Sequence, residues 1–171
     1  MATKTKTKSK KMEQVHVGLS AENRQKLIQL LNKLLADEHL LYTKTRNYHW
    51  NVTGIHFTEL HVLFEEQYNA LQLIADEVAE RCRMLGGTAI GTMAEFLDHT
   101  RLSETPGTVP SAPDMLANLL DDHEQIITNL RDDIDASTEK LGDEGTGDLL
   151  IGTMRSHEKM AWMLRSMADG S

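Results

Sequence analysis

Residues 60–87 read LHVLFEEQYNALQLIADEVAERCRMLGG, and this segment is the strongest indicator of the architecture. Its large apolar residues recur mostly three or four positions apart or at multiples of that spacing, which is typical of one face of an α-helix. They are Leu60, Leu63, Phe64, Leu71, Ile74, Val78 and Met84. Gly86 and Gly87 then end the pattern as a helix C-terminus does. The segment predicts a long amphipathic helix from about Thr58 to Leu85.

Three further segments have helical spacing and recognisable ends. Ser20 is a good N-cap before a leucine-rich stretch, and Ser111 with Pro113 starts another helix. The predicted helices cover residues 19–50, 111–137 and 146–168, and a short helix is expected over 92–99 within the long connection 88–110. Four helices of roughly 25 residues with a long middle connection predict an all-α, ferritin-like four-helix bundle.

Length and composition limit the function classes. The chain has 171 residues and a single cysteine, which excludes an internal disulfide framework and any cysteine-rich zinc or iron–sulfur site. No apolar run approaches the roughly 20 residues of a membrane-spanning helix, and the start lacks the apolar stretch of a secretory signal. We therefore expect a cytoplasmic protein with no membrane partner. The sequence also lacks a glycine-rich phosphate loop, a nucleophile elbow and a dinucleotide-binding fingerprint.

Charge is distributed unevenly along the chain. The net charge is −8, yet residues 1–12 contain five lysines and no acidic residue, which leaves −13 for the rest. The five are Lys4, Lys6, Lys8, Lys10 and Lys11. We expect residues 1–18 to form a disordered tail before a domain over 19–171. Such a tail either solubilises the protein or binds the phosphates of double-stranded DNA, the latter only if many copies act together.

The helix expected over 58–85 carries four candidate metal ligands: His61, Glu65, Asp76 and Glu80. At about 100° per residue they lie at about 0°, 40°, 60° and 100°, so all four share one face. They form two pairs, His61 with Glu65 and Asp76 with Glu80, and the two members of each pair are four residues apart. A combination of imidazole and carboxylate ligands suits iron, manganese or zinc. The alternative interpretation is a polar helix face exposed to solvent.

Distance decides how these pairs can meet. His61 and Asp76 are separated by about 22 Å along a helix, which no single metal site spans. The pairs can share an ion only if a second copy of the helix lies antiparallel, with a two-fold axis near Ala70 and Leu71. The predicted metal site therefore belongs to a dimer.

His49 is a further candidate ligand. It lies in Tyr48-His49-Trp50-Asn51, where the first helix ends, next to a turn that can bring it against the second helix. A histidine beside aromatic residues is also compatible with a packed core position. In combination with the other candidates, we predict that His49 is a ligand.

An ordered set of motifs resembles the Dps family, the DNA-binding proteins from starved cells, which are small dodecameric ferritins. The motifs are YHWNVTG over 48–54, LHVLFE over 60–65, ADEVAER over 75–81 and LGG over 85–87, within a resemblance that covers about residues 20–168. The resemblance implies an inter-subunit ferroxidase centre with His49, His61 and Glu65 from one subunit and Asp76 and Glu80 from its partner. The family usually carries Asp where this chain has Glu65, whose extra methylene changes the reach of the carboxylate.

The resemblance also implies an activity. Family members oxidise Fe(II), preferably with hydrogen peroxide rather than dioxygen, and store the ferric mineral in a hollow 12-subunit shell. Trp50 would donate electrons beside the site, or alternatively pack at the dimer interface. Asp143, Glu144 and Asp148 would surround a three-fold iron-entry pore, or alternatively form an ordinary acidic helix start. A second acidic cluster, Asp132, Asp133 and Asp135, is expected on a solvated face.

Three functional interpretations follow. The leading one is an iron-oxidising and iron-storing protein that protects DNA by removing iron and peroxide. The alternative is a nucleoid-condensing protein that binds DNA through its lysine-rich tails. The third is a bundle that binds zinc at the same site without turnover.

Overall fold

The computed structural model describes residues 12–168, and this part of the chain forms helices and contains no strand. The helices are α1 (Ala21–Asn51), α2 (Phe57–Met84), α3 (Met93–His99), α4 (Ala112–Asp135) and α5 (Glu144–Ala168), with a π-helical segment over Ala136–Lys140 between the last two. Every predicted helix end lies within two residues of the observed end. The prediction of an all-α bundle with a short extra helix is confirmed.

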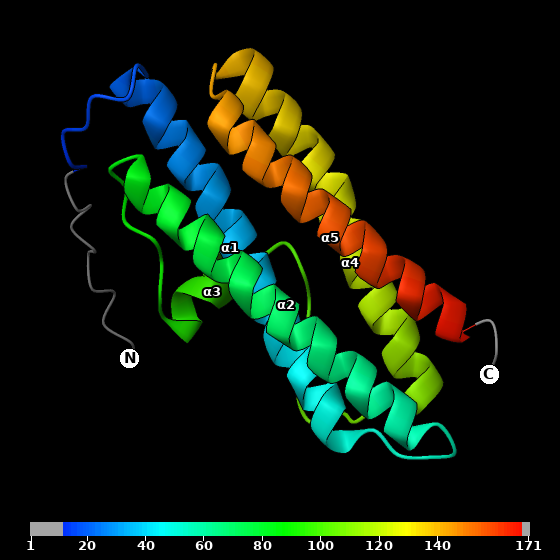
Figure 1. Ribbon diagram of the computed structural model, residues 1–171. Coiled ribbons are helices and arrows are strands. Elements are labelled where there is room, and N and C mark those ends of the chain that lie inside the picture. Colours follow the sequence, from blue (N-terminus) through cyan, green and yellow to red (C-terminus); the bar gives the residue numbers. More distant parts are fainter. Residues whose placement is uncertain (1–11, 169–171) are drawn as a thin grey trace, which may run out of the picture.

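The long helices are arranged as two antiparallel pairs. Figure 1 shows α1 beside α2 and α4 beside α5, with the two pairs packed along their lengths. The connection that contains α3 runs back along the bundle, so that α4 starts at the end where α2 begins. This long crossover gives α2 and α4 the same direction, as the predicted topology requires.

The core is built mainly from leucines, and its packing is close. Leu27, Leu31 and Leu34 of α1 have no exposed surface, and they belong to the same cluster as Phe64 of α2. At Gly87 an added Cβ would lie 2.6 Å from the Ile28 side chain, so only glycine permits this approach of the chain to α1. Cys82 is fully buried, and desolvation raises the pKa of its thiol to about 11.

Ion pairs fix the long connection to the bundle. Asp37 of α1 is completely buried and accepts hydrogen bonds from the backbone N–H of Arg101 at 2.6 Å and from its Nε at 2.7 Å. The guanidinium of Arg101 also binds Asp133 of α4 at 2.8 Å. Asp133 is therefore partly buried in an ion pair, and the prediction that it lies on a solvated face is wrong. Lys44 completes the attachment, because it donates to the Ser103 carbonyl and to Asp122.

A polar chain crosses the middle of the bundle. Glu38 of α1 lies 2.9 Å from Nε2 of His157 on α5, whose Nδ1 lies 2.9 Å from Nδ1 of His123 on α4. All three side chains are fully buried. Desolvation first, and then the neighbouring His157, hold the pKa of His123 well below its usual value. His157 uses both of its ring nitrogens in this chain, whereas Nε2 of His123 and Oε2 of Glu38 have no hydrogen-bond partner among the described residues. The chain links three helices through the core.

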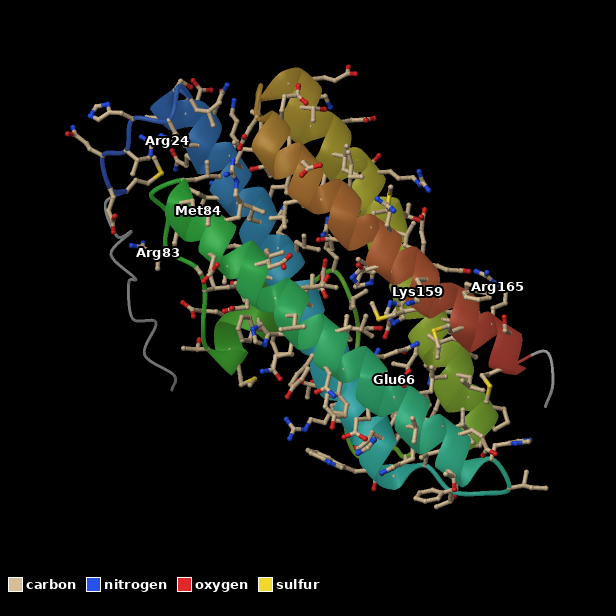
Figure 2. All side chains as sticks on the ribbon, viewed as in Figure 1. Arg24, Glu66, Arg83, Met84, Lys159 and Arg165 are labelled. Atoms are coloured by element: carbon tan, nitrogen blue, oxygen red, sulfur yellow. The ribbon has the colours of Figure 1, made fainter. Side chains whose placement is uncertain are left out.

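The segment before α1 is better anchored than predicted. The backbone N–H of Glu13 donates to the Gly86 carbonyl at 2.9 Å, and Arg24 donates to the Glu13 carbonyl. The Glu13 carboxylate pairs with Arg83. Figure 2 places Arg24, Arg83 and Met84 at this same end of the α1–α2 pair. The tail boundary at residue 18 stays a prediction, although Glu13 within it contacts the bundle, and residues 1–11 lie outside the described residues.

The turn between α4 and α5 also differs from a simple helix end. The chain continues from α4 into the π-helical segment and only then reaches Gly142, which has a φ of +68°. A hydrogen bond from the Asp143 backbone N–H to the Ser137 carbonyl closes the turn at 2.9 Å.

Over residues 12–168, none of the helices combines the length and apolar character needed to cross a bilayer.

Candidate metal centre

Two histidines meet where α1 ends and α2 begins. His49 lies in the last turn of α1 and His61 in the first turns of α2, and the intervening turn contains Gly54 at a φ of +114°, a conformation that favours glycine. The two imidazoles stack with ring centroids 3.7 Å apart and planes inclined by 21°. The predicted approach of His49 to the second helix is thus present in the structure.

The histidines hold each other through their backbones. Nδ1 of His49 lies 2.8 Å from the His61 carbonyl, and Nδ1 of His61 lies 2.9 Å from the His49 carbonyl. A carbonyl oxygen can only accept, so each Nδ1 must carry the hydrogen that it donates. Both Nε2 atoms are then left with a lone pair, which is the form in which imidazole binds a metal ion. The reciprocal hydrogen bonds therefore prepare both rings as ligands.

One carboxylate and one phenol adjoin this pair. Glu65 follows His61 by one helical turn and is exposed, and its Oε1 accepts a hydrogen bond from the Tyr68 hydroxyl at 3.3 Å. The Tyr68 ring meets His49 edge to face, with centroids 5.2 Å apart. Desolvation first, and then Glu65, raise the pKa of Tyr68.

Asp76 and Glu80 lie further along α2, and both are exposed. The helix is continuous over Phe57–Met84, so Asp76 stays about 22 Å along the axis from His61. Within residues 12–168, no three His, Cys, Asp or Glu side chains gather at one point where they could hold a metal ion. The structure thus brings His49 and His61 together, places Glu65 one turn away, and leaves Asp76 and Glu80 at a different level of the same helix.

Two aromatic side chains, Trp50 and Tyr68, lie near the histidine pair in different settings. Trp50 is 65% exposed, and its indole faces the guanidinium of Arg46, with Cζ 5.4 Å from the ring centroid. The same guanidinium lies 5.5 Å from the ring centroid of Tyr68 and bonds the Tyr42 hydroxyl. Sequence reasoning missed Tyr68, although it follows His61 by seven residues and so shares its helix face.

The acidic residues before α5 fall into two groups. Asp143 is buried and accepts two hydrogen bonds from Arg81, at 2.8 and 2.9 Å, together with one from the Thr146 hydroxyl. Burial alone would raise the pKa of Asp143, but these hydrogen bonds hold it below its usual value. Within one subunit, Arg81 therefore compensates the charge of Asp143, and the role of Asp143 at an iron-entry pore stays a prediction. Glu144 and Asp148 are exposed at the start of α5.

The predicted DNA-binding lysines lie outside the described residues. They are Lys4, Lys6, Lys8, Lys10 and Lys11. The residue nearest to them with described contacts is Met12, which packs against the core. Their prediction rests on sequence alone.

Comparisons with known proteins agree with this architecture. A model of the ferritin-like domain matches residues 28–170. An uncharacterized low temperature-induced protein of Nostoc sp. is 51% identical over 159 residues, which cover 93% of this chain and 89% of that protein. The structure of DpsC from Streptomyces coelicolor is 35% identical with a TM-score of 0.89, covering 95% of each chain.

A second solved structure adds a chemical description. The Dps protein of Vibrio cholerae O1 is 34% identical with a TM-score of 0.84, covering 93% of this chain and 99% of that one. It is described as a member of a broad superfamily of ferritin-like diiron-carboxylate proteins. The four-helix topology, the domain match and these likenesses agree. The chain belongs to the Dps family of ferritin-like proteins.

Proposed function

We propose that the protein oxidises Fe(II) at a centre shared between two subunits and stores the ferric product. The observation that carries the proposal is the reciprocal hydrogen bonding of His49 and His61, which leaves both Nε2 atoms free to bind a metal ion. In the proposed centre these atoms and Glu65 come from one subunit, while Asp76 and Glu80 come from its two-fold partner. The diiron-carboxylate description of a related Dps protein supports iron as the substrate.

The outer face of α2 supports the partner subunit. Leu73 is 68% exposed, and Val62 and Met84 are also open to solvent. On a helical wheel these apolar residues lie within about 80° of Asp76 and Glu80. Large apolar side chains exposed among candidate ligands indicate a surface that another protein covers. An antiparallel copy of α2 would cover this face and carry the missing carboxylates to the histidines.

The ligand types suit iron oxidation. Carboxylate oxygens are hard ligands that stabilise Fe(III) relative to Fe(II), whereas imidazole nitrogen binds both oxidation states. Two Fe(II) ions supply one electron each to hydrogen peroxide, whose O–O bond breaks to give two hydroxide ions. Paired delivery of both electrons avoids release of a hydroxyl radical. We propose peroxide as the preferred oxidant, with dioxygen as the alternative, and a 12-subunit shell as the store.

Removal of one imidazole tests the proposed oxidation. After anaerobic loading with Fe(II), addition of hydrogen peroxide to the His61→Ala variant is expected to produce ferric absorbance at least tenfold more slowly than in the wild type. The reason is that the variant loses one of the two nitrogen ligands and also the ring that stacks against His49, the other ligand. The His56→Ala variant, altered at an exposed histidine of the turn, is the matched control. Equal rates in His61→Ala and the wild type would contradict the proposal, and tight zinc binding without turnover would favour a zinc-binding bundle.

We propose that iron enters beside the acidic residues at the start of α5, where Glu144 and Asp148 are exposed and Asp143 is paired with Arg81. Glu144 and Asp148 are four residues apart and exposed, so their carboxylates lie on one face of the helix. Repetition of this face around a three-fold axis would create a negative potential that attracts Fe(II). The buried pair of Arg81 and Asp143 would fix the position of this helix start.

A second candidate function is non-specific binding of double-stranded DNA in the cytoplasm, with association to the nucleoid. The five lysines of residues 1–11 support it, as do relatives named for DNA protection during starvation. The Glu13 contacts would fix where each arm leaves the surface, and a shell presents many arms together. Avidity then multiplies weak phosphate contacts.

Deletion of residues 1–11 tests this function. We expect the truncated protein to lose retardation of duplex DNA in gels at low salt, because each lysine that replaces a counterion adds salt-dependent affinity. Iron oxidation should remain at the wild-type rate, which serves as the internal control. DNA retardation that is unchanged by the deletion would rule out the arms as the binding element.

A further inference from the structure

The position of the Glu65 carboxylate is the least constrained part of the proposed centre. Glu65 is exposed on α2, and a glutamate side chain has three rotatable bonds whose ordering costs free energy. His49 and His61, in contrast, are fixed by their reciprocal hydrogen bonds. A ligand with this freedom binds an ion weakly unless a neighbouring group holds it.

Tyr68 is placed to hold it. The Tyr68 hydroxyl donates to Oε1 of Glu65 at 3.3 Å, one turn along the same helix. A carboxylate can accept this hydrogen bond on one oxygen and still offer its other oxygen to a metal ion. The phenol therefore restricts Glu65 without consuming its capacity as a ligand.

The Tyr68 ring is itself fixed on three sides. His49 meets it edge to face at 5.2 Å, and Tyr42 does so at 6.0 Å with an angle of 89°. The guanidinium of Arg46 lies over it, with Cζ 5.5 Å from the centroid. Arg46 in turn bonds the Tyr42 hydroxyl. Side chains of α1 therefore contact the Tyr68 ring of α2 on three sides and fix the position of its hydroxyl.

We propose that Tyr68 is a positioning residue that holds Oε1 of Glu65 and thereby directs Oε2 to the metal ion bound by His49 and His61. This inference rests on the proposed metal centre. It adds that Arg46 holds the Tyr68 ring in place and that Tyr68 in turn holds the Glu65 carboxylate. It also assigns a role to the longer glutamate side chain. An aspartate at position 65 is one methylene shorter and would not reach the hydroxyl of Tyr68.

A double-mutant cycle on the full-length assembled protein tests the proposal. Co²⁺ serves as the probe, because it binds nitrogen and oxygen ligands and its visible spectrum reports coordination geometry. Tyr68→Phe is expected to weaken Co²⁺ binding about three- to tenfold and to change that spectrum, since the charge-assisted hydrogen bond is lost. In a Glu65→Asp background, Tyr68→Phe should change the affinity less than twofold, because no such bond remains to lose.

Controls separate this role from general packing. Tyr48→Phe removes a different hydroxyl, the partner of Asn118, and should leave the Co²⁺ affinity unchanged. Wild-type affinity and spectrum in Tyr68→Phe, or an equal loss in both backgrounds, would overturn the positioning role. Failure of the metal centre itself gives a different result, namely Co²⁺ binding that His61→Ala does not weaken, and that result would overturn both proposals.

Discussion

Two inactive variants, assembled together, are expected to recover iron oxidation. The first is His61→Ala, and the second is the double variant Asp76→Asn/Glu80→Gln. Alone, each should lose most of its activity, because every centre lacks either an imidazole or both partner carboxylates. In a mixed dimer one of the two centres combines the intact His61 of one chain with the intact Asp76 and Glu80 of the other. That centre is complete, and the other carries both defects.

The amount of recovery can be calculated from symmetry. Random assembly of equal amounts makes about half of the dimers mixed, and each mixed dimer holds one complete centre, so about a quarter of all centres should be active. The measurement is the initial rate of ferric absorbance after co-refolding, with subunit mixing verified by mass spectrometry. This recovery depends on ligands from opposite subunits and cannot arise if each chain carries a whole centre.

A matched mixture provides the control. His61→Ala and Glu65→Ala both alter the half of the centre that one chain supplies, so every centre in their mixed dimers keeps one defect. This mixture is expected to stay inactive. Recovery in the control as large as in the test mixture, or no recovery in a test mixture proven to contain mixed dimers, would contradict the inter-subunit centre.

The second large effect is expected on stability. Asp37→Ala should lower the free energy of unfolding by about 3–5 kcal/mol, because it leaves the partly buried guanidinium of Arg101 and its backbone N–H without their main partner. Asp37 also accepts from the Thr100 hydroxyl at 2.9 Å, so the loss extends to the start of the long connection. The measurement is unfolding in guanidinium chloride at fixed subunit concentration.

An exposed aspartate of the same bundle is the control for this prediction. Asp132 lies on α4 next to Asp133 but is exposed, and Asp132→Ala should change the free energy of unfolding by less than about 0.5 kcal/mol. The variant Asp37→Asn keeps the shape and should fall between the two. An unfolding midpoint for Asp37→Ala equal to that of the wild type would show that the Arg101 contacts do not stabilise the bundle.

The fold was predictable because its determinants are local. Leucine spacing identifies each long helix, and the expected N-caps are present, since the side chains of Ser20 and Ser111 accept from backbone N–H groups three residues later. The position of the long connection between the second and third long helices was enough to choose the bundle topology. These signals act within about one helical turn and need no knowledge of tertiary neighbours.

The ion pairs were not predictable in the same way. Asp143 and Asp133 look like any other acidic residue in the sequence, and their burial depends on arginines that are distant in the chain, Arg81 and Arg101. The anchoring of residues 12–18 rests largely on the Glu13 backbone, which carries no side-chain signature. Such partners become visible only when the helices have been placed side by side.

The candidate metal centre could be predicted from the sequence only in part. The spacing of His61, Glu65, Asp76 and Glu80 on one helix, combined with their separation, predicted that a metal site shared by both pairs would need a second subunit. The stacking of His49 on His61 could be expected only in outline, because it depends on the path of the turn through Gly54. The contact between Tyr68 and Glu65 needed side-chain positions, although the helix period places both residues on the same face.

The burial of Cys82 has a chemical consequence for a protein that would handle peroxide. With a pKa of about 11, only about one thiol in ten thousand is ionised at neutral pH, and the fully buried sulfur is closed to reagents in solution. Oxidation to sulfenic acid requires the ionised, accessible form. The sole sulfhydryl of the chain is therefore expected to resist oxidation and to form no covalent cross-link with another subunit.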